Sequence, residues 1–229
     1  MFLTVKKLDV AYGSAKILHN VSLDINQGEM VFLMGRNGAG KTTFLKTIAG
    51  FLNPSKGSIV FDGREISGYT IEKAAEEKIR YVFQDKRVFG SLTVRENIEL
   101  AAFGAKEKLT DAIKKVLWVY SDLEKYLDLK ARSLSGGQRQ MLLMGRALIG
   151  NPKLLLIDEP TEGLAGGTVN DTIQILAKLK GQITMLIVEQ NIHTVAELAD
   201  RVFIMKEGKI EREIHKADIR NQAKVEAYL

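Results

Sequence analysis

The sequence contains no cysteine, which excludes disulfide bonds, a thiolate nucleophile and zinc sites built on cysteine. It also has no run that approaches the roughly 18 apolar residues of a membrane-spanning helix. Its longest apolar stretches are short, for example Met30–Met34 and Leu154–Ile157. Met1–Asp9 alternates apolar and polar residues like a strand and has no signal-peptide core. We therefore expect a cytoplasmic protein that reaches a membrane only through a partner.

A strong charge of either sign is also missing. Lysine and arginine number 33, and aspartate and glutamate number 28, which gives a net charge of +5. An excess this small, spread along the chain, is typical of a solvated surface, and we expect no nucleic-acid partner. Hydrophobic residues make up 45% of the 229 residues, so the chain can bury a substantial core. This length predicts one domain, with room for an inserted subdomain.

Short strands alternate with helices along most of the sequence, which predicts an α/β fold with a mostly parallel sheet. The predicted strands are Leu3–Val10, Val21–Ile25, Met30–Met34, Ser58–Phe61, Arg80–Phe83, Leu154–Ile157, Ile183–Val188 and Val202–Lys206. The predicted helices are Lys41–Ala49, Gly136–Ile149, Val169–Leu179, Ile192–Leu198 and a closing helix in the tail Arg212–Leu229. Because Thr93–Leu129 also has helical spacing, we expect residues 91–150 to form a helical block inserted into a core of residues 1–90 and 151–229.

A glycine-rich loop follows the predicted strand Met30–Met34. Residues 35–42 read Gly-Arg-Asn-Gly-Ala-Gly-Lys-Thr and fit the pattern G-x-x-x-x-G-K-[ST] of a phosphate-binding loop. The glycines let backbone N–H groups surround a polyphosphate. We expect Lys41 to reach the β- and γ-phosphates of a nucleotide, Thr42 to bind Mg²⁺, and Thr43 to hold the α-phosphate side. The predicted nucleotide-binding residues of this loop are Asn37, Gly38, Ala39, Gly40, Lys41, Thr42 and Thr43.

Two carboxylates, Asp158 and Glu159, end the apolar strand Leu154–Ile157. Ligands of a parallel sheet bind at the carboxyl ends of its strands, so Asp158 should lie near Thr42. Its hard oxygens suit Mg²⁺, which Asp158 would hold directly or through water. Glu159 follows Asp158 directly, and its side chain should point to the opposite side of the strand. We predict that Glu159 polarises the attacking water.

The segment Leu134–Gln138 reads Leu-Ser-Gly-Gly-Gln and precedes a predicted helix. Ser135 is a favourable N-cap, and the glycines leave backbone N–H groups bare, which makes a second anion site. A glycine turn before a helix is common on its own. Together with residues 35–42, Gln84 and Leu154–Glu159, in this order, the segment resembles the signature of ABC transporter nucleotide-binding subunits. The resemblance covers essentially the whole chain.

This resemblance implies a P-loop ATPase core with an amino-terminal antiparallel β-subdomain, and an inserted helical subdomain that carries the signature. It also implies that two ATPase subunits, identical or paralogous, pack head to tail and drive transmembrane permease subunits. ATP and Mg²⁺ would then lie between residues 35–42 of one subunit and the signature of the other. The signature residues that would bind ATP in trans are Ser135, Gly136, Gly137 and Gln138.

Three further positions carry a role only through this resemblance. Tyr12 matches the aromatic residue that stacks on adenine. Gln84 matches the catalytic glutamine that touches Mg²⁺ and the attacking water. Phe89 follows Gln84 and would suit a groove that receives a short permease helix, although packing in the core is the alternative.

The sequence departs from the family pattern at two positions. The family usually has an aspartate where this chain has Ala165, and a histidine where it has Gln190. Gln190 can donate and accept hydrogen bonds but cannot gain a proton near neutral pH. We hypothesise that Gln190 senses the γ-phosphate while Glu159 polarises the water. His193 lies nearby in sequence, and we expect it on a helix surface.

These departures also point to a subfamily. Three strings resemble one of the ATPase subunits of branched-chain amino-acid importers: Gly35–Gly38, Glu159–Gly163 and Val188–Asn191. Importers of urea or other amides, and exporters, remain open. DNA-repair or chromosome ATPases insert long coiled coils before the signature, and this chain has no sustained heptads there. Ribosome-acting relatives carry two such domains in one chain, and this chain has one.

Overall fold

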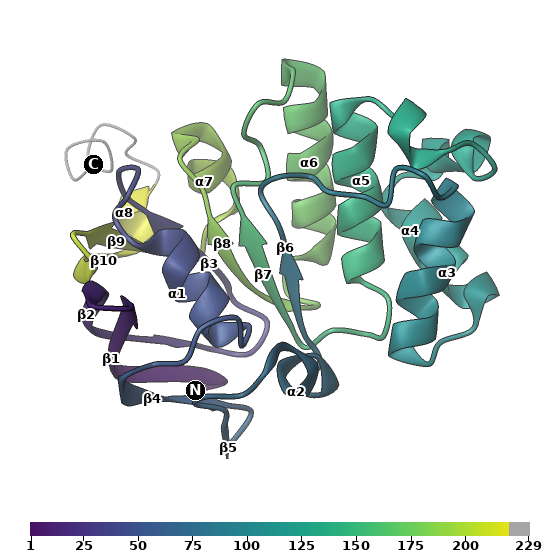
Figure 1. The fold of residues 1–229 in the computed structure, drawn as a ribbon. Helices are drawn as coiled ribbons and strands as arrows, with labels where there is room; N and C mark the ends of the chain where they lie inside the picture. The colour runs from purple at the N-terminus through teal and green to yellow at the C-terminus, as the bar shows by residue number, and fades with distance from the viewer. Residues whose placement is uncertain (220–229) are drawn as a thin grey trace.

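The computed structural model describes residues 1–219 and contains two sheets (Figure 1). Their strands are β1 (Leu3–Tyr12), β2 (Ala15–Ile25), β3 (Met30–Met34), β4 (Lys56–Phe61), β5 (Arg64–Glu65), β6 (Ile79–Val82), β7 (Leu154–Asp158), β8 (Thr184–Val188), β9 (Arg201–Lys206) and β10 (Lys209–His215). The four-stranded sheet is antiparallel, in the order β2-β1-β4-β5. The six-stranded sheet has the order β10-β9-β3-β8-β7-β6, and its strands are parallel except for β10 against β9.

Helices cover both faces of the larger sheet. They are α1 (Lys41–Ile48), α2 (Ile71–Glu76), α3 (Val94–Ala105), α4 (Leu109–Val119), α5 (Gly136–Ala147), α6 (Gly166–Leu179), α7 (Ile192–Leu198) and α8 (Lys216–Ile219), with short 3₁₀ turns η1 (Ser121–Tyr126) and η2 (Ala131–Ser133). No helix within residues 1–219 combines the length and the apolar character that a membrane crossing needs.

The six-stranded sheet separates two hydrophobic cores. Its inner strands β3, β7 and β8 are buried along their whole length. Because successive side chains of a strand point to opposite faces, Phe32 and Ile157 join the core beneath α3–α7. Leu33 and Leu156 join the other core, which includes α1 and the smaller sheet. Continuous apolar strands are the expected consequence of burial on both faces.

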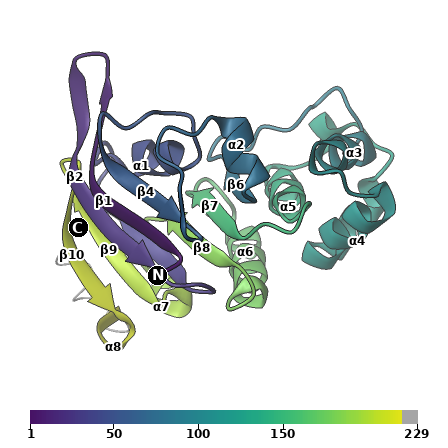
Figure 2. The same cartoon turned by 90° about the horizontal axis from the view of Figure 1, so that it is seen from below.

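Helix α1 lies between the two sheets, and the view from below shows the smaller sheet on its outer side (Figures 1 and 2). Its residues Phe44, Leu45 and Ile48 are fully or almost fully buried in the core shared by both sheets. This packing fixes the axis of α1, whose amino end starts directly after β3 and the glycine-rich loop.

Helices α3, α4 and α5 stand together beyond β6, at one side of the molecule in both views (Figures 1 and 2). Helix α3 begins at a capping box in which Thr93 and Glu96 exchange side-chain and backbone hydrogen bonds. Helices α4 and α5 pack closely where Gly145 faces Val116. A Cβ on Gly145 would lie only 3.0 Å from the Cα of Val116. The division of the chain at residues 91 and 150 stays a prediction.

The predicted fold class is confirmed, and most predicted strands and internal helices appear within a few residues of their expected ends. Strand β2 begins at Ala15, six residues before the predicted start at Val21, and the helical stretch predicted over Thr93–Leu129 consists of α3, α4 and the 3₁₀ turn η1. The prediction of a closing helix from Arg212 is wrong at the start of that helix, because Arg212–His215 belongs to β10 and pairs antiparallel with β9. Helix α8 covers only Lys216–Ile219, and the rest of the predicted helix lies outside the described residues. The sequence reading also missed β5 and α2, two short elements of two and six residues.

Candidate active site

Three loops meet at the carboxyl ends of neighbouring parallel strands. The glycine-rich loop follows β3, the acidic pair ends β7, and Gln190 follows β8. A cavity of about 440 Å³ opens between them. Its lining residues are Ile17, Asn37, Gly38, Ala39, Gly40, Lys41, Thr42, Thr43, Gln84, Glu159 and Glu162. The structure thus places every residue predicted for the phosphate loop around one cavity, together with Gln84 and Glu159.

The shape of the glycine-rich loop depends on two of its glycines. Gly35 and Gly40 have φ angles of 149° and 105°, in the region that favours glycine. A Cβ on Gly35 would lie 2.1 Å from the carbonyl oxygen of Met205, and one on Gly40 would lie 2.8 Å from Cδ2 of Leu18. The loop therefore fits against β9 and β2 only with glycine at these positions.

Lys41 begins α1 and is only 5% exposed. Its Nζ donates hydrogen bonds to the carbonyl oxygens of Gly35 at 2.7 Å and Arg36 at 3.1 Å. Burial lowers the pKa of the Lys41 ammonium, while the nearby Glu159 and Asp158 carboxylates act in the opposite direction. The ammonium is thus held at the mouth of the loop by weak neutral acceptors, which a bound polyphosphate can replace.

Asp158 is buried at the end of β7, and each of its carboxylate oxygens accepts a hydrogen bond. Oδ1 accepts one from Oγ1 of Thr42 at 3.2 Å, as the strand-end argument predicts. Oδ2 accepts one from the hydroxyl of Tyr81 on β6 at 2.7 Å. Burial and the Asp158 charge raise the pKa of Tyr81, so the phenol stays protonated and donates. The sequence reading missed Tyr81, and only its place near the end of a parallel strand could have indicated it.

Glu159 lies at the edge of the cavity between two amide side chains. Its Oε1 accepts a hydrogen bond from Nε2 of Gln190 at 2.8 Å, and its Oε2 accepts one from Nε2 of Gln84 at 3.1 Å. Nε2 of Gln84 also donates to Glu162. Burial raises the pKa of the Glu159 carboxyl, and Glu162 adds to this, whereas the Gln190 hydrogen bond opposes it.

Gln190 connects the acidic pair to the glycine-rich loop. Its Nε2 donates to Oδ1 of Asn37 at 2.8 Å as well as to Glu159. The side chain that replaces the usual histidine of the family is therefore inside the site. It forms a bridge from the carboxylate after β7 to the loop after β3.

Tyr12 and the signature residues are not among the residues that line this cavity. Tyr12 ends β1 with 47% of its surface exposed. Ser135 caps α5 in a capping box with Gln138, and the residues lining the cavity include none of Ser135–Gln138. The structure therefore does not bring the signature to the phosphate loop of the same chain.

Three other positions have clear surroundings. Ala165 precedes α6 as its N-cap and supplies no side-chain hydrogen bond there. His193 is exposed on α7 and lies 3.7 Å from Glu197, which confirms the predicted helix-surface position. Phe89 is 49% exposed and lines a second cavity, so it is not a core residue.

A strand, a glycine-rich loop and a helix that cradle a polyphosphate, with a buried aspartate and a second carboxylate opposite, define a nucleotide hydrolase of the P-loop class. The family model described as ABC transporter matches residues 18–162. The chain belongs to the ABC transporter family, and it is an ATP-binding, ATP-hydrolysing subunit of that family.

Individual relatives agree with this assignment. The chain is 38% identical over 210 residues to the high-affinity branched-chain amino acid transport ATP-binding protein BraG of Pseudomonas aeruginosa. The aligned residues make up 91% of this chain and 90% of BraG. It is 34% identical to the probable branched-chain amino acid transport ATP-binding protein LivF of Archaeoglobus fulgidus, with 89% and 88% covered. The dimeric ATP-binding cassette MJ0796 bound to ADP and Pi superimposes with a TM-score of 0.84 at 29% identity, over 93% of this chain and 98% of that one.

Proposed function

We propose that this chain hydrolyses ATP to drive the import of branched-chain amino acids through partner permease subunits. The observation that carries the catalytic part is Glu159, held between the amides of Gln84 and Gln190 beside the phosphate loop. The names of BraG and LivF support the solute. Other relatives, at 33–35% identity, are named for xylose/arabinose or sulfate/thiosulfate import and for lipopolysaccharide export, so another transport system is the alternative.

The residues divide the work of hydrolysis as follows. The phosphates of ATP would lie on the backbone N–H groups of residues 37–43 and on the positive end of α1. Lys41 would exchange its carbonyl partners for the β- and γ-phosphate oxygens. Glu159 would accept a hydrogen bond from the attacking water, helped by a raised pKa, and Gln190 would donate to the γ-phosphate. Phosphoryl transfer needs little covalent chemistry from the protein, so positioning and charge dominate.

The magnesium that accompanies ATP has a matching set of donors. Oγ1 of Thr42, which lines the cavity, lies 3.2 Å from Oδ1 of Asp158, and both are hard oxygens. Tyr81 occupies the other oxygen of Asp158, which leaves Oδ1 for the cation. Thr42, Asp158 and, from the cavity edge, Gln84 would hold Mg²⁺, which supplies charge neutralisation to the phosphates.

The signature supports the proposal of a second ATPase subunit. Ser135, Gly136 and Gly137, at the amino end of α5, do not line the cavity of their own chain. Helix α5 has twelve residues, and the amino terminus of such a helix is a good anion site. A second copy of this chain, or a paralogue, would bring the nucleotide to that terminus. Tyr12, exposed at the end of β1, would stack on the adenine. In this arrangement each ATP joins two subunits.

A groove of about 570 Å³ supports the proposal of a permease partner. It lies between β6, the segment after it, α3 and α5, with Phe89, Leu100 and Leu143 among its apolar walls. Phe89 and Leu100 remain 49% and 44% exposed. A groove with exposed apolar walls fits the apolar face of an amphipathic helix. Such a partner would hold the chain at the inner face of the cell membrane.

The charge of the groove indicates what the permease helix carries. Arg146 lines the groove, and its Nε has no hydrogen-bond partner within residues 1–219. The guanidinium lies 5.6 Å from the ring of Phe89, and burial lowers its pKa. A buried donor without a partner is costly, so we expect the docking helix to supply a carboxylate or a carbonyl acceptor to the Arg146 guanidinium.

The proposal is tested with the complex of this chain and its permeases in proteoliposomes that contain ATP. Uptake of labelled leucine should exceed that of urea, xylose or sulfate, and Glu159→Gln in the same complex should abolish it. Isolated Glu159→Gln protein should retain ATP binding and form an ATP-bound dimer in size-exclusion chromatography. Preferred uptake of another solute would overturn the solute, and a Glu159→Gln monomer at saturating ATP would contradict the shared-nucleotide model.

A further inference from the structure

Glu189 is a buried carboxylate beside the site that has no assigned role. It follows β8 directly and is 2% exposed. Burying a charged side chain is expensive unless several hydrogen bonds compensate for the lost water. The surroundings of Glu189 therefore show what its charge is used for.

Four hydrogen bonds converge on the Glu189 carboxylate from two different loops. Oε2 accepts from Oγ1 of Thr161 at 2.8 Å and from the backbone N of Thr161 at 3.3 Å. Oε1 accepts from the backbone N of Gln190 at 2.8 Å and of Asn191 at 3.0 Å. One oxygen thus binds the loop after β7, and the other binds the loop after β8.

These two loops carry the two side chains that must meet. Glu159 lies two residues before Thr161 and has a φ angle of 47°, an unfavourable conformation for a residue with a Cβ. Gln190 lies directly after Glu189, and its Nε2 reaches Glu159 at 2.8 Å. A shift of either loop would change this contact, because each side chain projects from a backbone that Glu189 holds.

We propose that Glu189 is a positioning residue for ATP hydrolysis, which fixes the loop of Glu159 against the loop of Gln190. This inference rests on the proposed role of Glu159 in polarising the water. Glu189 itself lies behind the reacting groups and does not line the cavity. Its removal should therefore affect turnover far more than nucleotide affinity.

The first test is Glu189→Gln, which keeps the size of the side chain but turns one accepting oxygen into a donor. The amide cannot satisfy both pairs of N–H groups, so one loop is released. Displacements of about 1 Å can cost on the order of 100-fold in rate, and we expect kcat for ATP to fall about 10- to 100-fold while KM changes less than about 3-fold.

The matched control is Glu29→Gln. Glu29 is a largely buried carboxylate with several donors, but it precedes β3, the parallel neighbour of β8, and so lies at the opposite end of the sheet from Glu189. Its substitution should lower the melting temperature and leave kcat unchanged. A purely structural Glu189 would behave like Glu29: equal loss of melting temperature in both variants with unchanged kcat in Glu189→Gln would overturn the proposal.

Thr161 supplies a second test if Glu189→Gln does not fold. Thr161→Val removes the hydroxyl that donates to Glu189, and Thr161→Ser keeps it. Turnover should fall in the valine variant and be largely restored in the serine variant, and equal turnover in the two would overturn the proposal. Where Glu189→Gln does fold, its losses and those of Thr161→Val should combine less than multiplicatively in the double variant, because both changes break one connection.

A failure of the positioning role can be distinguished from a failure of the proposed function. Glu159→Gln is measured alongside in the same ATPase assay. Unchanged hydrolysis in Glu159→Gln would remove the role of Glu159, and the positioning role of Glu189 with it. An inactive Glu159→Gln together with a fully active Glu189→Gln would remove the positioning role alone.

Discussion

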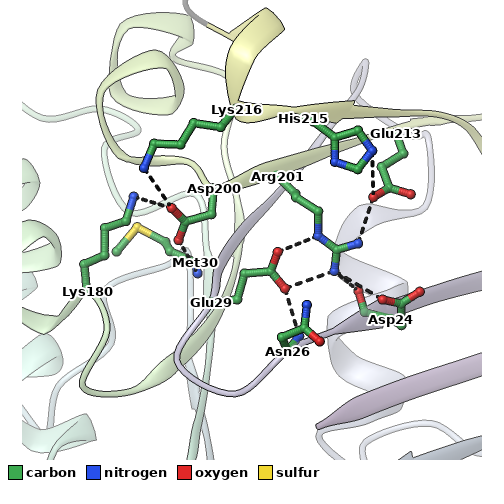
Figure 3. A network of polar contacts seen from close by, with 10 residues as sticks. All are labelled: Asp24, Asn26, Glu29, Met30, Lys180, Asp200, Arg201, Glu213, His215 and Lys216. Atoms are coloured by element: carbon green, nitrogen blue, oxygen red, sulfur yellow. Dashed lines mark hydrogen bonds and ion pairs between the residues drawn. The ribbon is translucent and has the colours of Figure 1, made fainter. Parts of the chain in front are cut away.

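The two ends of the six-stranded sheet carry polar clusters of opposite character. At the amino ends of β3 and β9, Arg201 lies among three carboxylates, those of Asp24, Glu29 and Glu213 (Figure 3). At the carboxyl ends, Lys41 and Glu159 lie in the phosphate-loop cavity. Both clusters are partly buried. They differ in how well their charged side chains are paired.

The amino-end cluster is well satisfied. Nη2 of Arg201 donates to Glu29 at 3.0 Å, and Nη1 donates to Glu213 at 2.8 Å. Burial acts to lower the pKa of Arg201, but the hydrogen bonds to Glu29 and Glu213 outweigh it and raise the pKa. Because Asp24 lies on β2 and Glu213 on β10, this one guanidinium joins the two sheets. The cluster therefore stabilises the fold.

The carboxyl-end cluster is held under unfavourable conditions. Burial lowers the pKa of Lys41 and raises that of Glu159, so the charged form of each is disfavoured. Glu159 also has a left-handed backbone conformation, with φ of 47°. Groups arranged for a ligand commonly reduce stability in its absence. The comparison predicts that substitutions at the two ends separate function from stability.

The largest effect is expected from Lys41→Met at the carboxyl end. Losing a buried charge-assisted contact costs roughly 2–5 kcal/mol, so ATP affinity should fall by at least about 30-fold. Titration with a fluorescent ATP analogue measures this. The melting temperature without nucleotide should stay the same or rise, since a buried ammonium with only carbonyl acceptors is replaced by an apolar side chain. A large drop in melting temperature would contradict the comparison.

The next effect is expected from Arg201→Met at the amino end. It leaves three carboxylates near one another without their cation, and breaking such a pair should cost about 3 kcal/mol of unfolding free energy. Chemical denaturation measures this loss. Well below the melting temperature, kcat and KM for ATP should match those of the unchanged protein, because Arg201 lies at the far end of β9 from the cavity. A fall in kcat without a loss of stability would break the comparison.

The parts of the site that depend on local sequence could be predicted. The phosphate loop and the acidic end of β7 are contiguous strings, and the rule that parallel strands place their carboxyl ends together correctly predicted that Thr42 and Asp158 are neighbours. For these residues, the chemistry could be derived from a motif and a strand order. Gln190 was predicted only through the family resemblance, as the residue in place of the usual histidine.

The rest depends on partners that are distant in sequence. Tyr81 and Asp158 are 77 residues apart, Glu189 and Thr161 are 28 apart, and no pattern in the sequence marks either pair. The error at β10 has a different cause. Within Arg212–His215 only Ile214 is apolar, so this stretch has no periodicity that would separate a strand from a helix. Pairing with β9 decided between the two.

The smallest effect concerns the pH dependence of Glu159. Hydrolysis needs its carboxylate, so kcat should fall as the pH drops through the raised pKa of this group. The matched variant is Glu162→Gln, which removes the neighbouring charge that helps raise this pKa. At a pH on the acidic limb, this variant should retain about 3-fold more of its own maximal kcat than the unchanged protein does. An unmoved acidic limb would show that Glu162 does not influence Glu159.

The unfolding free energy provides an independent test of the raised pKa of Glu159. Its dependence on pH should be opposite to the dependence that most carboxylates give. A pKa that is higher in the folded than in the unfolded state means that the folded protein binds the proton more tightly. Stability conferred by this group is therefore complete below its unfolded pKa and is lost as the pH rises through its folded pKa. Relative to Glu159→Gln, the unchanged protein should lose unfolding free energy over that window and then remain at a constant difference. Denaturation curves at a series of pH values measure this difference, and a gain with rising pH would contradict the raised pKa of Glu159.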